Sequence, residues 1–249
     1  MRETTSFEHI AEIWDAKTGN KGSKMISATK VTAKHIIAEL GNLSNKKVYE
    51  IACGNGFLSR LLSPKVKEMR ASDISSKLID YAKNKYDSTN IAYEVRDAID
   101  FTGLPKNHFD AIIIHQGIFY IKDIDALAQG IYRILKHNGV LIFSNMHPLM
   151  YVADIDSNPK IKLKPVLEKY RLYLKNRTME VNKTWHVGKE VKPATYHQFK
   201  RPFSFYTNKL AQHGLPTVKI IEPSTVTMIK NKVLKSPIPS AMIVKCMKI

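Results

Sequence analysis

A glycine-containing turn between two apolar segments is the feature of this sequence best suited to binding a ligand. The short apolar run Val48–Ile51 leads into Gly54 and Gly56, and an apolar segment with helical spacing follows. Asp73 ends a second strand-like run about 20 residues beyond the first glycine, the distance expected of a ribose-binding acid. Glycines let a backbone approach a ligand closely, and a carboxylate can accept both ribose hydroxyls. This layout predicts a nucleoside-binding βαβ unit.

Two departures from the dinucleotide-binding pattern narrow the ligand. That pattern has a third glycine three residues after Gly56, where Ser59 stands. In addition, Glu50 lies inside the first strand, close to the start of the turn. Its negative charge would repel a pyrophosphate but would favour an ammonium or a sulfonium group. We therefore expect an adenosine derivative with a positively charged tail.

Five segments resemble, in order and spacing, the motifs of class I S-adenosylmethionine-dependent methyltransferases. Glu50–Gly56 resembles motif I, although Ala52 stands where the first glycine of the family is expected. Asp73 matches the acid that binds the ribose, and Asp97 matches the acid that reads the adenine amino group. The other two segments, Phe109–Gln116 and Arg133–Phe143, resemble the fourth-strand motif and the turn into the fifth strand. The resemblance runs from about Phe7 to the C-terminus.

The resemblance implies S-adenosylmethionine as cofactor, S-adenosylhomocysteine as product, and no metal. It also implies an N-terminal lid, because Trp14-Asp15 and the loop Gly19–Gly22 resemble a lid found in one branch of the family; an amphipathic helix can equally place a Trp in a plain core. The expected cofactor-binding residues are Trp14, Glu50, Ala52, Cys53, Gly54, Asn55, Gly56, Asp73, Ile74, Asp97, Ala98, His115 and Gln116.

Two histidines are candidate catalytic bases, because methyl transfer to a hydroxyl or an ammonium requires the loss of a proton. His147 follows the fifth strand and His115 ends the fourth. Each has a structural alternative, and His147 lies in Asn145–Pro148, which resembles a His-Pro turn of the family.

Substrate contacts are expected from a segment rich in Lys, Tyr and Pro. Tyr120, Tyr196, Lys200 and Arg201 are the candidates, the last two as a clamp for an anion. The aromatic residues of this segment either line a site for a flat or apolar substrate or form a small satellite core. They are Tyr151, Tyr170, Tyr173, Trp185, Tyr196, Phe199, Phe203, Phe205 and Tyr206.

Strand and helix alternate five times, which predicts an α/β fold with a doubly wound, mostly parallel sheet. The resemblance implies that this sheet has the seven-stranded, Rossmann-like form of the family. Expected strands cover residues 47–51, 68–73, 91–96, 111–114 and 140–143, and a helix after Asp123 should end at Asn138-Gly139. Thr5–Glu8 reads as a capping box that opens the first helix. Residues 1–147 would form lid helices and the cofactor-binding half, and 148–205 an inserted substrate cap. A helix near 206–213 and strands near 216–222 and 241–248 are expected within residues 206–249. The resemblance implies that these two strands form an antiparallel hairpin that completes the sheet.

Composition bounds the class of protein. A hydrophobic content of 44% is typical of a globular chain, and no apolar stretch is long enough to predict a transmembrane helix. The first residues lack a secretory signal pattern, and two cysteines suggest reduced thiols, so a cytoplasmic protein is expected. The net charge of +17 is uneven: residues 1–150 hold 20 basic and 16 acidic residues, leaving +13 for residues 151–249.

The basic C-terminal part keeps three functions open. The first is a methyltransferase that acts on an O, N or C nucleophile of a small molecule, for which the charge favours an anion. The second is an RNA methyltransferase, although His115-Gln-Gly-Ile stands where an Asn-Pro-Pro-Tyr type motif would follow the fourth strand. The third is a nucleoside-binding protein without activity. The positive charge can also reflect a general lysine bias in composition with no binding role, since Lys outnumbers Arg 31 to 8.

Overall fold

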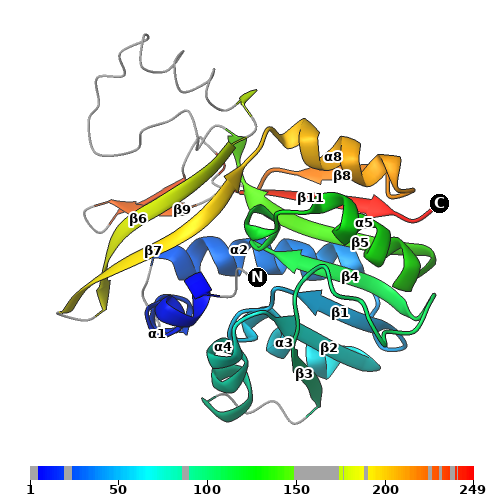
Figure 1. Cartoon of the computed structure of the whole chain (residues 1–249), viewed down its shortest axis with the longest axis horizontal. Coiled ribbons are helices and arrows are strands. Elements are labelled where there is room, and N and C mark those ends of the chain that lie inside the picture. Colours follow the sequence, from blue (N-terminus) through cyan, green and yellow to red (C-terminus); the bar gives the residue numbers. More distant parts are fainter. Residues whose placement is uncertain are drawn as a thin grey trace.

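Seven strands form one mixed sheet in the computed structural model, in the order β3-β2-β1-β4-β5-β11-β8 (Figure 1). The structure describes residues 5–19, 24–85, 90–148, 174–175, 177–187, 190–223, 226–229, 232–235, 239 and 241–249. The strands are β1 Lys47–Ile51, β2 Glu68–Asp73, β3 Ile91–Val95, β4 Phe109–His115, β5 Leu135–Met146, β8 Thr217–Ile221 and β11 Ala241–Met247. All neighbours pair in parallel except β11, which is antiparallel to both β5 and β8. This confirms the predicted doubly wound α/β sheet with an antiparallel C-terminal pair.

Helices cover both faces of this sheet. The α-helices among the described residues are α1 Thr5–Gly19, α2 Lys24–Leu40, α3 Phe57–Leu62, α4 Ser76–Asp80, α5 Ile124–Ile134 and α8 Phe203–Gln212. Strand β4 contributes to the hydrophobic clusters on both faces of the sheet. Ile112 and Ile114 belong to the cluster that includes residues of α5 and α8, whereas Ala111 and Ile113 belong to the cluster that includes residues of α2 and α3. Burial on both faces explains why this strand is continuously apolar.

The passage from α5 to β5 differs from the prediction. The helix ends at Ile134, and Leu135 is already extended and paired with Phe109. Asn138 has φ 59° and lies within the early, irregular part of β5. Asn138-Gly139 therefore lies inside the strand, with Asn138 in a left-handed conformation, and is not the end of the helix. The predicted last strands and the helix before them agree with β8, β11 and α8 to within a few residues.

Two antiparallel hairpins were not predicted. Strands β6 Arg177–Val187 and β7 Glu190–Lys200 form a separate two-stranded sheet beside α1, and β9 Val226–Ile229 pairs with β10 Lys232–Lys235 (Figure 1). Tyr151, Tyr170 and Tyr173 of the predicted cap lie outside the described residues, as do Asn20, Lys21, Gly22 and the side chain of Trp185. The part of the chain that the structure describes includes no helix with the length and apolar character needed to cross a membrane.

The first helix is held against the rest of the domain by its polar residues. It begins at Thr5, and Glu8 accepts a hydrogen bond of 2.5 Å from the backbone N–H of Ser76 at the start of α4. Glu8 therefore caps α4, and the side chain of Thr5, on which the predicted capping box also depends, lies outside the described residues. Ile10 and Ala11 are buried, while Phe7 and Trp14 are only half-buried.

Candidate functional site

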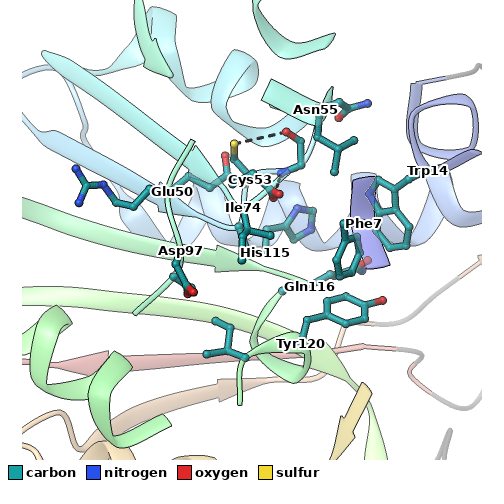
Figure 2. A pocket seen from close by; sticks show the side chains of 18 of the residues that line it. Phe7, Trp14, Glu50, Cys53, Asn55, Ile74, Asp97, His115, Gln116 and Tyr120 are labelled. Carbon is teal, nitrogen blue, oxygen red and sulfur yellow. Dashed lines mark hydrogen bonds between the residues drawn. The ribbon is translucent and has the colours of Figure 1, made fainter. Parts of the chain in front are cut away.

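A cavity of about 630 Å³ opens at the edge where β1, β2 and β4 end (Figure 2). This is the edge at which doubly wound sheets bind ligands, and the volume is within the usual range for such sites. All but one of the predicted cofactor-binding residues line it: Trp14, Glu50, Ala52, Cys53, Gly54, Asn55, Asp73, Ile74, Asp97, Ala98, His115 and Gln116.

The exception, Gly56, has a different task. Its φ is 74°, and a Cβ at this position would lie 2.2 Å from the Tyr93 hydroxyl oxygen. The glycine therefore lets the turn pack against β3, which a larger residue would prevent. Ala52 also adopts a left-handed conformation, with φ 57°, which explains why the family usually has glycine there. An alanine in this conformation costs about 1 kcal/mol.

Asp73 is fixed at the mouth of the glycine turn by backbone donors. Its Oδ2 accepts a hydrogen bond from the N–H of Gly54 at 2.8 Å, and its Oδ1 accepts one from the N–H of Ser75 at 3.0 Å. Ser75 itself caps α4, since its Oγ accepts from the N–H of Leu78. Burial raises the pKa of Asp73 despite these donors. A carboxylate offers about four acceptor positions, so it can also accept from a ligand hydroxyl.

Glu50 places a second carboxyl group beneath the turn. It is 1% exposed, and the Ser59 hydroxyl donates a hydrogen bond to it. Burial raises its pKa to about 7, an effect that the donated hydrogen bonds and the positive charge of Arg60 only partly offset. A nearby cation would favour the ionised form. Glu50 is thus suited to a positively charged ligand.

Helix α1 is tied to the glycine turn. The Asn55 side-chain amide donates to the carboxylate of Asp15 at 2.8 Å, and the Arg60 guanidinium donates to the backbone carbonyl of Asn55. The indole nitrogen of Trp14 lies 3.6 Å from the position that a Cβ of Gly54 would take. These contacts place Trp14 directly over the turn, as a lid would require.

His115 forms one wall of the cavity. Its Nε2 lies 2.8 Å from the Thr32 hydroxyl oxygen, and that hydroxyl in turn donates to the carbonyl of Thr29. This assigns the ring proton to Nε2 and leaves the lone pair on Nδ1, for which we find no partner among the described residues. Burial lowers the pKa of His115 to about 4, so the ring is neutral at physiological pH.

The other predicted base and the predicted anion clamp lie elsewhere. His147 is 5% exposed, does not line the cavity, and pairs with Glu222 at 2.9 Å. Arg201 is 7% exposed and donates hydrogen bonds to the backbone carbonyls of Ile121 and Lys122, while its guanidinium lies over the rings of two phenylalanines. The prediction that Arg201 binds an anion is therefore wrong, because its guanidinium donates to backbone carbonyls of the protein.

The remaining candidates divide between the cavity and the core. Tyr120 and Phe199 line the cavity, whereas Tyr196 is buried with Ile10 and Ile13 beneath α1. Lys200 is half-buried and does not line it. Tyr206 belongs to the main core, with Phe203 and Phe205 packed against it. Of the aromatic residues of the segment, Phe199 thus lines the cavity, whereas Tyr196 lies in a small separate cluster.

Sequence reasoning missed Phe7, Thr29 and His197, which also line the cavity. The spacing of Phe7 and Trp14 places both on one face of the helix, so the sequence could have predicted Phe7 beside Trp14. Thr29 is distant in sequence from every motif, and His197, although it is next to the candidate Tyr196, is not marked by any local pattern. Among the described residues we find no group of His, Cys, Asp and Glu that could hold a metal ion.

Comparison with known proteins assigns the central part of this chain. Residues 49–143 match the family model described as a methyltransferase domain. Residues 49–143 therefore form a methyltransferase domain of the class I S-adenosylmethionine-dependent family. Those residues include the glycine turn, Asp73, Asp97 and His115.

Curated relatives of this methyltransferase domain are distant. The putative methyltransferase YqeM of Bacillus subtilis is 28% identical over 114 residues, which cover 44% of this chain and 45% of that protein. A ubiquinone biosynthesis O-methyltransferase of Coxiella burnetii is 27% identical over 147 residues, covering 58% of this chain and 62% of that protein. The chain spans less than two thirds of the length of these curated relatives.

Solved structures share the fold over most of the chain. A putative S-adenosylmethionine-dependent methyltransferase from Listeria monocytogenes has a TM-score of 0.63 at 20% identity and covers 87% of this chain and 98% of its own. The magnesium protoporphyrin IX methyltransferase of Synechocystis, solved with bound S-adenosylhomocysteine, has a TM-score of 0.61 at 15% identity and covers 98% and 96%. At these identities the likeness concerns the fold alone.

Proposed function

We propose that this protein is a methyltransferase that uses S-adenosylmethionine and acts on a small molecule. One observation carries the proposal: two buried carboxyl groups, Glu50 and Asp73, flank a glycine turn at the ligand-binding edge of the sheet. Glu50 would meet the ammonium of the methionine part, and Asp73 would accept the ribose hydroxyls. Asp97, with Ile74 and Ala98 beside it in the cavity lining, would hold the adenine.

S-adenosylmethionine supplies a methyl group on a positively charged sulfur, so the leaving group is already activated. The lone pair of the acceptor forms the new bond to the methyl carbon while the carbon–sulfur pair stays on sulfur. The main task of the protein is then to hold acceptor and methyl in line, which can contribute roughly 7–11 kcal/mol. The ties from Asp15 to Asn55 and from Glu8 to Ser76 hold α1 over the site and support this task.

His115 is the better of the two candidate bases. Its Nδ1 lone pair would accept a hydrogen bond from the acceptor's O–H or N–H and orient the nucleophile. A pKa of about 4 keeps the ring unprotonated, but it also makes His115 a weak base. We therefore assign it first to positioning the acceptor. His147, paired with Glu222 outside the cavity, is assigned to the structure.

The cap assigned to residues 148–205 would complete the part of the cavity that binds the methyl acceptor, since His197 and Phe199 of β7 already line the cavity.

The RNA alternative has less support. Its basic field belongs to residues 151–249, many of which lie outside the described residues, whereas the cavity wall carries the carboxylates Glu50, Asp73, Asp97 and Asp123.

The test is to incubate the purified protein with deuteromethyl-labelled S-adenosylmethionine and a metabolite extract, followed by mass spectrometry. We expect a labelled metabolite that disappears with Asp73→Ala but remains with Asp80→Asn, an exposed carboxylate on α4. Label found in RNA alone would favour the second function. Cofactor binding with no labelled product from any extract would favour a nucleoside-binding protein without activity.

A further inference from the structure

Beyond the site of the cofactor, the cavity has a wall made of aromatic rings. Phe7 and Trp14 come from α1, and Tyr120 comes from the short turn after β4, Ile118–Tyr120. The Phe7 and Tyr120 ring centroids lie 4.8 Å apart with their planes at 79°. Trp14 meets both rings edge to face, at 6.1 Å and 6.3 Å. We call Phe7, Trp14 and Tyr120 the aromatic wall.

The aromatic wall lies at the end of the cavity away from the expected adenine position. Figure 2 shows its three rings on one side and Asp97 on the other, with His115 between them. Because Trp14 covers Gly54, the wall begins where the methionine part of the cofactor would end. The Nδ1 lone pair of His115 is then available next to the region that the wall encloses.

Each ring of the wall is only half-buried although α1 and β7 pack around it. Their exposed surface faces the cavity, and such surface is most favourably covered by another flat apolar group. Tilted and perpendicular rings present both faces and edges, so a planar ring can stack or meet them edge to face.

The charges around the cavity disfavour an anionic acceptor. Its lining includes four carboxyl side chains but two basic ones, Arg96 and Lys122. Arg96 donates to Glu94 at 3.0 Å and to the backbone carbonyls of Asp100 and Thr102. Arg201, the other nearby guanidinium, is used by backbone carbonyls. A negatively charged acceptor would enter a site with excess negative charge.

We infer that the methyl acceptor is a planar, uncharged aromatic molecule whose ring lies against Phe7, Trp14 and Tyr120 and whose hydroxyl or amino group points to His115. This inference rests on the proposed function and names its substrate class. The net charge of the whole chain would favour an anionic acceptor. The inference depends instead on the side chains that line the cavity.

The experiment is calorimetry on the full chain loaded with S-adenosylhomocysteine, using three probes of similar size. Naphthol is planar and neutral, decalol has the same skeleton but is saturated and not flat, and a hydroxynaphthalenesulfonate is planar and anionic. We expect naphthol to bind at least roughly fivefold more tightly than either of the others, the margin that aromatic contacts supply.

Variants test whether the wall is responsible. Tyr120→Leu should bring naphthol and decalol to within about twofold of each other, and Phe7→Leu should act in the same direction if the first variant does not fold. Tyr132→Leu, an exposed aromatic on α5, is the matched control and should keep the preference. Retained binding of S-adenosylhomocysteine reports that each variant is folded.

Equal binding of naphthol and decalol, or tighter binding of the sulfonate, would overturn the inference while leaving the methyltransferase proposal intact. Failure of S-adenosylhomocysteine to bind at all would instead overturn the proposed function, and the inference with it.

Discussion

Replacing Glu50 by Gln should stabilise the unliganded protein at alkaline pH and weaken its binding to S-adenosylmethionine. Glutamine keeps the size of the side chain and an oxygen that can accept the Ser59 hydrogen bond, but it cannot ionise. The substitution thus removes the charge and little else. Because the same charge serves the cofactor, stability and binding should move in opposite directions.

The pH dependence follows from the raised pKa of Glu50. Below about pH 4.5 the group is protonated in both the folded and the unfolded chain. As the pH rises toward 7 the unfolded chain releases this proton first, so ionisation draws the equilibrium toward unfolding. Above a folded pKa of about 7, against an ordinary value of 4.5, the full cost is about 3 kcal/mol at about 1.4 kcal/mol per pH unit.

The assay is urea denaturation of the unliganded wild type and of Glu50→Gln at about pH 5 and about pH 8. We expect an advantage of under about 1 kcal/mol for the variant at the lower pH and of up to about 3 kcal/mol at the higher one. Asp80→Asn removes an exposed carboxylate and should change little at either pH.

Two results would refute this reasoning. One is a variant that is less stable than the wild type at alkaline pH. The other is a difference that does not vary between the two pH values, since that would reflect packing and not ionisation.

Further substitutions test other parts of the site. Asp73→Ala should weaken S-adenosylmethionine binding by roughly 1.5–3 kcal/mol in calorimetry, the range for hydrogen bonds to a charged group; unchanged affinity would contradict the ribose assignment. Gly56→Ala should lower the melting temperature clearly, because its Cβ would overlap the Tyr93 hydroxyl, and adding Tyr93→Phe should recover part of the loss; a silent Gly56→Ala would disprove the close approach. His115→Ala should reduce turnover with little change in cofactor affinity, whereas His147→Ala should reduce stability only; the reverse pattern would return the catalytic role to His147.

The glycine turn and its acids could be predicted from the sequence because their geometry is local. Residues 50–73 form one strand, one turn, one helix and the next strand, so their spacing alone fixes where Glu50, Gly54 and Asp73 meet. Successive residues of β4 pack on opposite faces of the sheet, and this burial on both faces could likewise be predicted from the continuous apolar run.

Contacts between distant segments could not be predicted. Thr32 and His115 are 83 residues apart, and only the packing of α2 beside β4 brings them together. Arg201 looked like a free cation, but the fold places two carbonyls next to it. Strand β7 contains Pro193, which normally argues against a strand; a two-stranded hairpin consists only of edges and tolerates it.

Calorimetric titration of the full chain with S-adenosylmethionine, S-adenosylhomocysteine and NAD tests most directly whether the acidic cavity is built for a cationic adenosine derivative. We predict saturable binding of both S-adenosyl compounds at one site per chain and no binding of NAD. Binding of NAD, with none of S-adenosylmethionine, would contradict the account.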